Sequence, residues 1–157
     1  MMNITIRKST ESDADGVGNA LRQADLVELA ALGCFDPAGE LRNYITMAPE
    51  CFTACVDAIP VAMFGIGGPV LASRVQIWLL GTKRMEDYPL ALIRLARQYV
   101  ANKLQTFEML YNYTDYRHVE SIRFLRLVGF RFRPEFDKEV SGIRFRYFDI
   151  GVKSCAF

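Results

Sequence analysis

Apolar positions along the chain follow two periods, one typical of strands and one typical of helices. Residues 3–8 alternate with a period of two and predict a first strand. Three further runs of strand type occupy the middle of the chain, and they are CFTACVD, VAMFGIG and RVQIWLLG. We expect the first two to form a hairpin through residues 58–60, with residues 67–69 ending its second strand.

Helical spacing predicts two helices before this hairpin. The first has three N-cap candidates and ends near Gly33; the candidates are Ser9, Thr10 and Ser12, and its apolar positions are Val17, Leu21, Ala24, Val27 and Ala31. The second opens at Asp36–Pro37 and stops at Pro49; its apolar positions are Leu41, Tyr44 and Ile45.

Two more helices are predicted after the hairpin, on either side of the strand FEMLYNY. The first is capped by Asp87, tolerates Pro89 in its first turn, and has apolar residues at Leu92, Leu95, Ala96, Tyr99 and Val100. The second ends at Gly129 in a left-handed conformation, and its stripe is Val119, Ile122, Leu125 and Val128. The order of elements predicts one α+β (mixed α/β) domain over residues 1–157, with six to seven strands and about four helices.

The C-terminal tail contains two more strand-like runs, FRFRPEF and IRFRYFDIG, separated by the predicted turn DKEVSG. Its arginines alternate with aromatic residues, at positions Arg131, Arg133, Arg144 and Arg146. We interpret this as a half-solvated hairpin at a sheet edge, where charge discourages aggregation. A platform for RNA is the alternative, although no wider recognition motif accompanies the arginines.

Charge and composition exclude several classes of protein. The formal net charge is +1, so bulk charge does not indicate nucleic-acid binding, and only a local patch could supply it. No apolar run approaches the roughly 20 residues of a membrane span, and the N-terminus has no apolar core of a secretory signal. The four cysteines predict free thiols in a reducing compartment, and His118, the single histidine, leaves no metal site evident.

Several segments together resemble the GNAT (Gcn5-related N-acetyltransferase) fold over nearly the whole chain. They are RKSTESDADG, the hairpin CFTACVDAIPVAMFGIG, the strand RVQIWLLG with its following loop and helix, and SIRFLRLVGFRF. The segment SIRFLRLVGFRF resembles the family's signature helix, which is followed by Gly-Phe. The resemblance implies an acetyl-CoA cofactor and an N-acyltransferase activity.

A narrower resemblance concerns residues from about Trp78 to Phe132. The segment YNYTDYRHVESIRFLRLVGF is similar to the internal virion protein A family of short-tailed phages. The residues that carry the similarity are Asn112, Tyr113, Ile122, Arg123, Phe124, Leu125, Val128 and Gly129. This resemblance implies a phage protein that acts in virion morphogenesis, with virion proteins as partners, in the host cytoplasm or associated with the virion.

The GNAT resemblance also implies a set of cofactor-binding residues. By position in the family motif they are Trp78, Leu79, Leu80, Lys83, Arg84 and His118. Lys83 and Arg84 could meet the cofactor's phosphates, whereas the loop from Thr82 to Pro89 has no glycine that would let its backbone approach them. Glu86 and Asp87 in the same loop would repel phosphate, and an ordinary capped helix start is the alternative interpretation of the loop.

Catalytic residues are not identified by the sequence. Leu125 stands where many GNAT enzymes have the tyrosine acid, and His118 stands where the family has a cofactor-contacting asparagine. Three tyrosines near the same segment could replace the acid, and three carboxylates are candidates for the base; these are Tyr111, Tyr113, Tyr116, Asp57, Glu108 and Asp115. Two functions therefore stay open, a non-catalytic virion assembly protein and an acetyl-CoA-dependent N-acyltransferase with an atypical loop.

Overall fold

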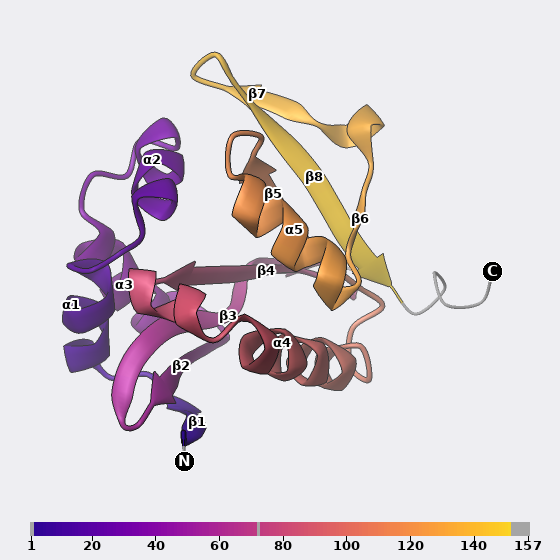
Figure 1. The fold of residues 1–157 in the computed structure, drawn as a ribbon. Helices are drawn as coiled ribbons and strands as arrows, with labels where there is room; N and C mark the ends of the chain where they lie inside the picture. Colours follow the sequence, from indigo (N-terminus) through magenta and orange to yellow (C-terminus); the bar gives the residue numbers. More distant parts are fainter. Residues whose placement is uncertain (1, 72, 152–157) are drawn as a thin grey trace. The chain divides into compact units, whose positions relative to one another are not determined.

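The computed structural model describes residues 2–71 and 73–151 of the chain. Its strands form one mixed sheet of eight strands, accompanied by five α-helices (Figure 1). The predicted α+β fold class is confirmed, with one more strand and one more helix than expected. The residues group into two compact units: unit 1 is Met1–Gly67 with Ile77–Pro89, and unit 2 is Gly68–Gln76 with Leu90–Phe157. The single domain expected from the sequence stays a prediction.

Unit 1 begins with a strand and three helices. They are β1 (Ile4–Lys8), α1 (Glu11–Gly18), α2 (Gln23–Ala31) and α3 (Pro37–Met47). Strand β2 (Glu50–Val56) pairs antiparallel with β1 and with β3 (Ile59–Leu71). Strands β3 and β4 (Arg74–Gly81) pass through both units, and the short 3-10 helix η1 (Lys83–Asp87) follows β4.

The core of unit 1 is a cluster of buried side chains from α1, α2, α3, β3 and β4 and from the segment between α1 and α2. Its members are Ala14, Val17, Leu21, Leu29, Leu41, Met63 and Leu80. Helices α1 and α3 lie close together at Gly18, where a Cβ atom would lie 2.5 Å from the Cα atom of Ala38. The two helices therefore pack backbone against backbone at this point, and only glycine leaves enough room.

The first predicted helix is wrong, because the structure divides it into α1 and α2. Helix α1 ends at Gly18, and α2 begins four residues after Asn19, at Gln23. Glycine and asparagine are poor helix formers, which favours a break here. Leu21 instead forms an antiparallel bridge with Thr82, beyond the end of β4. Backbone pairing between distant segments thus replaces the helical hydrogen bonds that the apolar spacing predicts.

The predicted hairpin of β2 and β3 is confirmed, but its turn differs. Asp57 and Ala58 have positive φ angles of 49° and 68°, so they form the turn. Ile59, which the sequence placed in the turn, opens β3. Aspartate tolerates this left-handed backbone better than most residues do, which accounts for its place in the turn.

The glycines at residues 67 and 68 do not end β3, which continues to Leu71, so this expectation is also wrong. A Cβ atom on Gly67 would lie 3.2 Å from the Trp78 ring, and one on Gly68 would lie 2.6 Å from the Gln76 side chain. These glycines make room for side chains of β4, and that close approach explains them better than a chain break.

In sequence order, unit 2 has one helix before and one helix after its strand β5. Its elements are α4 (Pro89–Lys103, which starts at the end of unit 1), β5 (Met109–Asp115), α5 (Val119–Val128), β6 (Arg131–Phe132), the 3-10 helix η2 (Pro134–Phe136), β7 (Lys138–Val140) and β8 (Ile143–Gly151). The first residues of β4 pair parallel with β5, and β8 pairs antiparallel with β5, β6 and β7. Gly129 ends α5 with φ 121°, as predicted.

Helix α4 begins at Pro89, whereas a cap at Asp87 would make Tyr88 its first residue. Asp87 lies in η1, and Tyr88 is the residue before Pro89, so the expected Asp87 cap is wrong. The buried residues of α4 are Leu92, Ile93 and Val100. No helix among the described residues combines the length and apolarity that crossing a membrane requires.

The C-terminal tail forms three strands instead of the two expected. The run FRFRPEF gives only the two residues of β6 before η2, because Pro134 cannot donate a backbone hydrogen bond. The predicted turn DKEVSG contains β7, and the turn itself is Ser141–Gly142, with φ angles of 51° and 77°. The predicted hairpin is therefore present with different bounds.

Three of the four cysteines lie in the described residues, and all three are free thiols, as predicted: Cys34, Cys51 and Cys55. Cys155 lies outside the described residues. Burial raises the pKa of the Cys34 thiol and of the Cys51 thiol. Fewer thiolates form at neutral pH as a result, which makes these two cysteines poor nucleophiles.

Helix α1 begins with a capping box around a buried carboxylate. Of the three predicted caps, Thr10 is the N-cap; its Oγ1 accepts a hydrogen bond from the Asp13 N–H, and Asp13 Oδ2 accepts one from the Thr10 N–H at 2.8 Å. Asp13 also accepts hydrogen bonds from Arg7 at 2.6 and 2.9 Å and from Thr53 at 3.0 Å. Burial raises the pKa of Asp13, but these hydrogen bonds outweigh it and lower the pKa to about 2.

Asp13 is expected to make the stability of the protein acid-sensitive. Its folded pKa lies below the ordinary value, so its contribution of about 2 kcal/mol is complete at neutral pH and is lost as the pH falls through the folded pKa. About 1 kcal/mol of this should be gone by about pH 3. Urea unfolding of the native protein and of Asp13→Asn, at neutral pH and at about pH 3, measures this contribution. Other titrating carboxylates contribute equally to both proteins, so the difference between the two acid losses belongs to Asp13. Equal acid losses in the two proteins would contradict the assignment.

Candidate functional site

Five of the six predicted cofactor-binding residues lie together in unit 1. Trp78, Leu79 and Leu80 form the last part of β4, and Lys83 and Arg84 are the first two residues of η1. Lys83 is exposed and Arg84 is half-buried, while Leu80 belongs to the apolar core. The structure therefore places two cations at the end of a strand whose other residues are largely apolar.

The backbone at the end of β4 is held by a segment far away in the sequence. The Gly81 N–H donates to Asp25 Oδ2 at 3.0 Å, and the Gly81 carbonyl accepts from the Arg22 N–H at 3.0 Å. The next residue is fixed to β3, since the Thr82 N–H and hydroxyl both donate to the Val61 carbonyl, at 2.8 and 3.0 Å. Both backbone groups of Gly81 are thus already engaged within unit 1.

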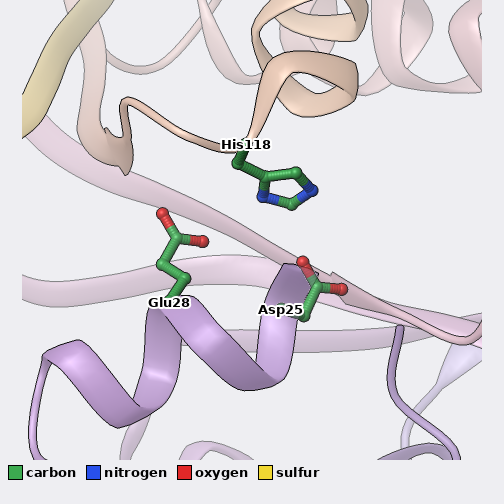
Figure 2. Close-up of side chains that lie close together, drawn as sticks. All are labelled: Asp25, Glu28 and His118. Atoms are coloured by element: carbon green, nitrogen blue, oxygen red, sulfur yellow. The ribbon is translucent and has the colours of Figure 1, made fainter. Parts of the chain in front are cut away.

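A buried ion pair anchors this arrangement. Arg22 and Asp25 are 8% and 1% exposed, and they are joined by two hydrogen bonds, Nε to Oδ2 at 3.1 Å and Nη2 to Oδ1 at 3.0 Å. Figure 2 shows Asp25 and Glu28 projecting from helix α2. Sequence reasoning missed the pair, although the Arg-x-x-Asp spacing at a helix start was a signal that could have found it.

The loop after β4 folds as a compact turn instead of an open glycine-rich cradle. Met85 is buried, and a Cβ atom on Gly81 would lie 2.6 Å from its sulfur. The Met85 N–H donates to the Thr82 carbonyl at 3.0 Å, which closes the turn. Glu86 and Asp87 are exposed in the same loop. The loop therefore offers two cations and two anions to solvent. The sulfur of the buried Met85 fills the space beside Gly81, the last residue of β4.

Trp78 lies between an aromatic ring and a glycine on the neighbouring strand. Its ring centroid is 4.5 Å from that of Tyr44, and its edge faces Gly67. Its Nε1 atom is buried and has no hydrogen-bond partner among the described residues. Burial, with the charge of Glu40, raises the pKa of Tyr44 to about 12. Tyr44 therefore stays protonated at neutral pH and can donate a hydrogen bond but cannot act as a base.

The sixth predicted residue, His118, belongs to unit 2 and is drawn in Figure 2. It is the residue before α5 and makes no side-chain capping hydrogen bond to the helix. His118 is buried, with only 5% of its surface exposed. Its neighbour Asp115 is also buried, and a reverse turn joins the two residues, because the His118 N–H donates to the Asp115 carbonyl at 2.9 Å.

Two of the three candidate bases have structural roles. The Asp57 carboxylate accepts a hydrogen bond from the Asn3 N–H at 3.0 Å within the hairpin turn. Asp115 is 1% exposed and pairs with Arg117 at 2.6 Å; this hydrogen bond lowers the pKa of Asp115, which makes its carboxylate a weak base. Glu108 is exposed before β5. Asp57 and Glu108 are exposed, and the pKa of the buried Asp115 is lowered, whereas a general base near neutrality is expected to be buried with a raised pKa.

The candidate tyrosines of unit 2 surround Tyr147, a residue that sequence reasoning did not single out. The rings of Tyr111 and Tyr113 lie 6.2 and 5.4 Å from that of Tyr147. Burial, followed by the charge of Asp149, raises the pKa of Tyr147 to about 12. Tyr116 is half exposed beyond the end of β5, and Leu125, at the family's acid position, lies half-buried on α5.

No protein-family model matches the sequence, and no curated protein matches it significantly. Many solved structures do match the fold. A GNAT-family acetyltransferase from Bacillus anthracis has a TM-score of 0.69 and 15% identity, with 94% of each chain covered. The PaiA N-acetyltransferase of Thermoplasma acidophilum, solved with coenzyme A, has a TM-score of 0.66 and 13% identity, with 95% of this chain and 99% of that chain covered.

A Bacillus subtilis acetyltransferase solved with CoA is similar in the same way. Its TM-score is 0.64 at 13% identity, over 97% of this chain and 99% of that one. Identities this low carry information about the fold alone, but the coverage is nearly complete in both directions. Together with the order of strands and helices described above, these likenesses show that the chain has the GNAT acetyltransferase fold.

Proposed function

We propose that this chain is a GNAT-type N-acyltransferase that binds its acyl-coenzyme A donor weakly. The observation that carries the proposal is the likeness to acetyltransferases over 94–98% of this chain. Three of the similar structures, PaiA, the B. subtilis enzyme and AAC(6')-Ib, were solved with CoA or acetyl-CoA. A fold alone does not dictate an activity, which depends on the residues at the site.

The residues at the end of β4 fit an anionic cofactor through charge. Lys83 and Arg84 reach solvent there and would contact phosphate groups, and Trp78, Leu79 and Leu80 would line the path of the remaining chain. His118 stays a predicted contact. The Gly81 N–H is already bonded to Asp25, and the loop has no inner glycine, so the backbone contributes little to holding phosphate. Weak binding follows from contacts made by flexible side chains alone.

Acyl-CoA would supply an activated thioester that an amine attacks, with coenzyme A leaving as the thiol. Among the described candidates, Asp115 is a weak base and Tyr44 a protonated phenol. Leu125, at the family's acid position, cannot exchange a proton at neutral pH. The chain's contribution to such a reaction would therefore consist mainly of binding and orientation, with water accepting the proton of the amine.

A second candidate function is a non-catalytic role in assembling a phage particle, with virion proteins as partners in the host cytoplasm. A specific observation favours it. Asp25 holds the Gly81 N–H, and Glu86 and Asp87 place negative charge in the loop where phosphate would bind. Both features would weaken an acyl-CoA site, and neither would hinder a protein that contacts only other proteins.

Calorimetric titration with CoA tests the two candidates. We expect the native protein to bind with a Kd on the order of 0.1–1 mM, and Lys83→Gln/Arg84→Gln to bind about tenfold more weakly. The matched control is Lys8→Gln/Arg42→Gln, which removes two cations from other parts of unit 1 and should bind like the native protein. Absence of heat at about 5 mM CoA would overturn the acyltransferase proposal, and co-purification with virion proteins would then support the second candidate.

A further inference from the structure

The formal net charge of the chain is +1, but the charged residues are divided unevenly between its two units. The residues of unit 1 include 6 Lys and Arg against 11 Asp and Glu, a formal charge of −5. The residues of unit 2 include 13 Lys and Arg against 7 Asp and Glu, a formal charge of +6. Such asymmetry within one chain indicates that the basic part meets an acidic partner.

Every aspartate of unit 2 is already matched with an arginine. The pairs are Asp115 with Arg117 at 2.6 Å, Asp137 with Arg144 at 2.6 Å and Asp149 with Arg133 at 2.8 Å. The other acidic residues of the unit are glutamates on its surface, at positions 108, 120, 135 and 139. The described part of unit 2 has nine further Lys and Arg residues, which outnumber these four glutamates and leave a positive surplus.

Part of this surplus is gathered around Phe132 on β6. The guanidinium carbon of Arg126, on α5, lies 5.3 Å from the centre of the Phe132 ring, and that of Arg146, on β8, lies 4.6 Å from it. Among the residues that the structure describes, neither arginine forms an ion pair. Arg123 is exposed one turn before Arg126 on α5. We call Arg123, Arg126 and Arg146, with the Phe132 ring, the arginine patch.

The geometry of the arginine patch suits phosphate. A guanidinium that lies over an aromatic ring is held in place by its face, and its N–H groups point outward from its edge. Those N–H groups match the oxygens of a phosphate, and no carboxylate of residues 2–71 or 73–151 forms an ion pair with Arg126 or Arg146. The patch combines side chains from α5, β6 and β8, so the fold fixes their spacing. Repeated phosphates on a flexible strand could contact several of its arginines together.

We propose that the arginine patch binds the sugar–phosphate backbone of single-stranded nucleic acid, without preference for base sequence. The Phe132 ring is half-buried and two arginines lie over it, so they compete with any base that would stack on it. Contacts to phosphate carry no sequence information, which predicts binding that depends on salt and not on sequence. The proposal concerns unit 2 alone and does not rest on the acyltransferase function.

Fluorescence anisotropy with a labelled single-stranded DNA of about 20 nucleotides tests the patch. Each phosphate contact contributes about 0.7 to the slope of log Kd against log salt for single strands. The double variant Arg126→Gln/Arg146→Gln should therefore reduce that slope by about 1.4 and weaken binding about tenfold or more at low salt. Two oligonucleotides of unrelated sequence should give the same affinity for the native protein.

The control variant is Lys8→Gln/Arg42→Gln, which removes two positive charges from unit 1 and should keep the native slope. Thermal melting of both double variants establishes that they fold. Equal loss of DNA affinity in the two double variants would show that bulk charge is responsible. That result would overturn the proposal that the arginine patch is the binding site. A native protein that leaves the anisotropy unchanged at about 50 mM salt but binds vesicles of phosphatidylcholine and phosphatidylserine would overturn nucleic acid as the partner.

Discussion

Replacing Asp25 with alanine is expected to lower the free energy of unfolding by about 3–5 kcal/mol. Asp25 accepts two hydrogen bonds from Arg22 and one from the Gly81 N–H, and it is 1% exposed. Its removal leaves the Arg22 guanidinium buried without the carboxylate that compensates its charge. The Gly81 N–H also loses its acceptor at the end of β4, so the loss combines an uncompensated charge with an unsatisfied backbone donor.

Urea unfolding measures the Asp25 effect, and two further variants sharpen it. Asp15→Ala removes an aspartate whose ion pair with Arg42 is exposed on both sides, so it should cost less than about 1 kcal/mol. Arg22→Met/Asp25→Leu replaces the buried pair by apolar residues and should recover much of the stability lost in Asp25→Ala. Similar losses for Asp25→Ala and Asp15→Ala would contradict the role of burial.

Gly18→Ala is expected to destabilise the protein by about 1–3 kcal/mol, because the added methyl group overpacks the contact between α1 and α3. Its Cβ atom would lie 2.5 Å from the Cα atom and 2.7 Å from the backbone nitrogen of Ala38. Both of these atoms belong to the backbone of α3, so no side-chain rotation can relieve the clash. The helices must separate, and the buried side chains between them then lose contact.

Gly16→Ala on the same helix is the matched control for Gly18→Ala. A Cβ atom on Gly16 would meet nothing within 4 Å, and its backbone is helical. Alanine should therefore stabilise the protein by about 0.5–1 kcal/mol through its better helix propensity. Thermal or urea unfolding should give opposite signs for the two variants. The same sign for both would show that α1 and α3 are not in close contact at Gly18.

Local sequence signals predicted most of the elements because their causes are local. The apolar, β-branched composition of RVQIWLLG, the Asp36–Pro37 start of α3 and the Gly129 end of α5 each depend on neighbouring residues only. The errors arose where distant segments meet. Leu21 leaves the helical pattern to pair with Thr82, and Gly67 accommodates Trp78 instead of ending a strand.

The candidate site was only partly predictable for the same reason. The motif positions of Lys83 and Arg84 follow directly from their place after β4, and the absence of glycine in the loop is visible in the sequence. The engagement of Gly81 by Asp25 joins residues 56 positions apart, and no local pattern reveals it. The burial of His118 likewise depends on the fold, and no local pattern reveals it.

The position of Trp78 makes the protein its own spectroscopic reporter. It is the single tryptophan of the chain, and it lies within unit 1 against Tyr44 and Gly67. Tryptophan emission will therefore follow the opening of unit 1 alone, whereas far-ultraviolet circular dichroism follows the helices and strands of both units. Coincident transitions by the two signals would identify one cooperative folding unit, and separated transitions would identify two.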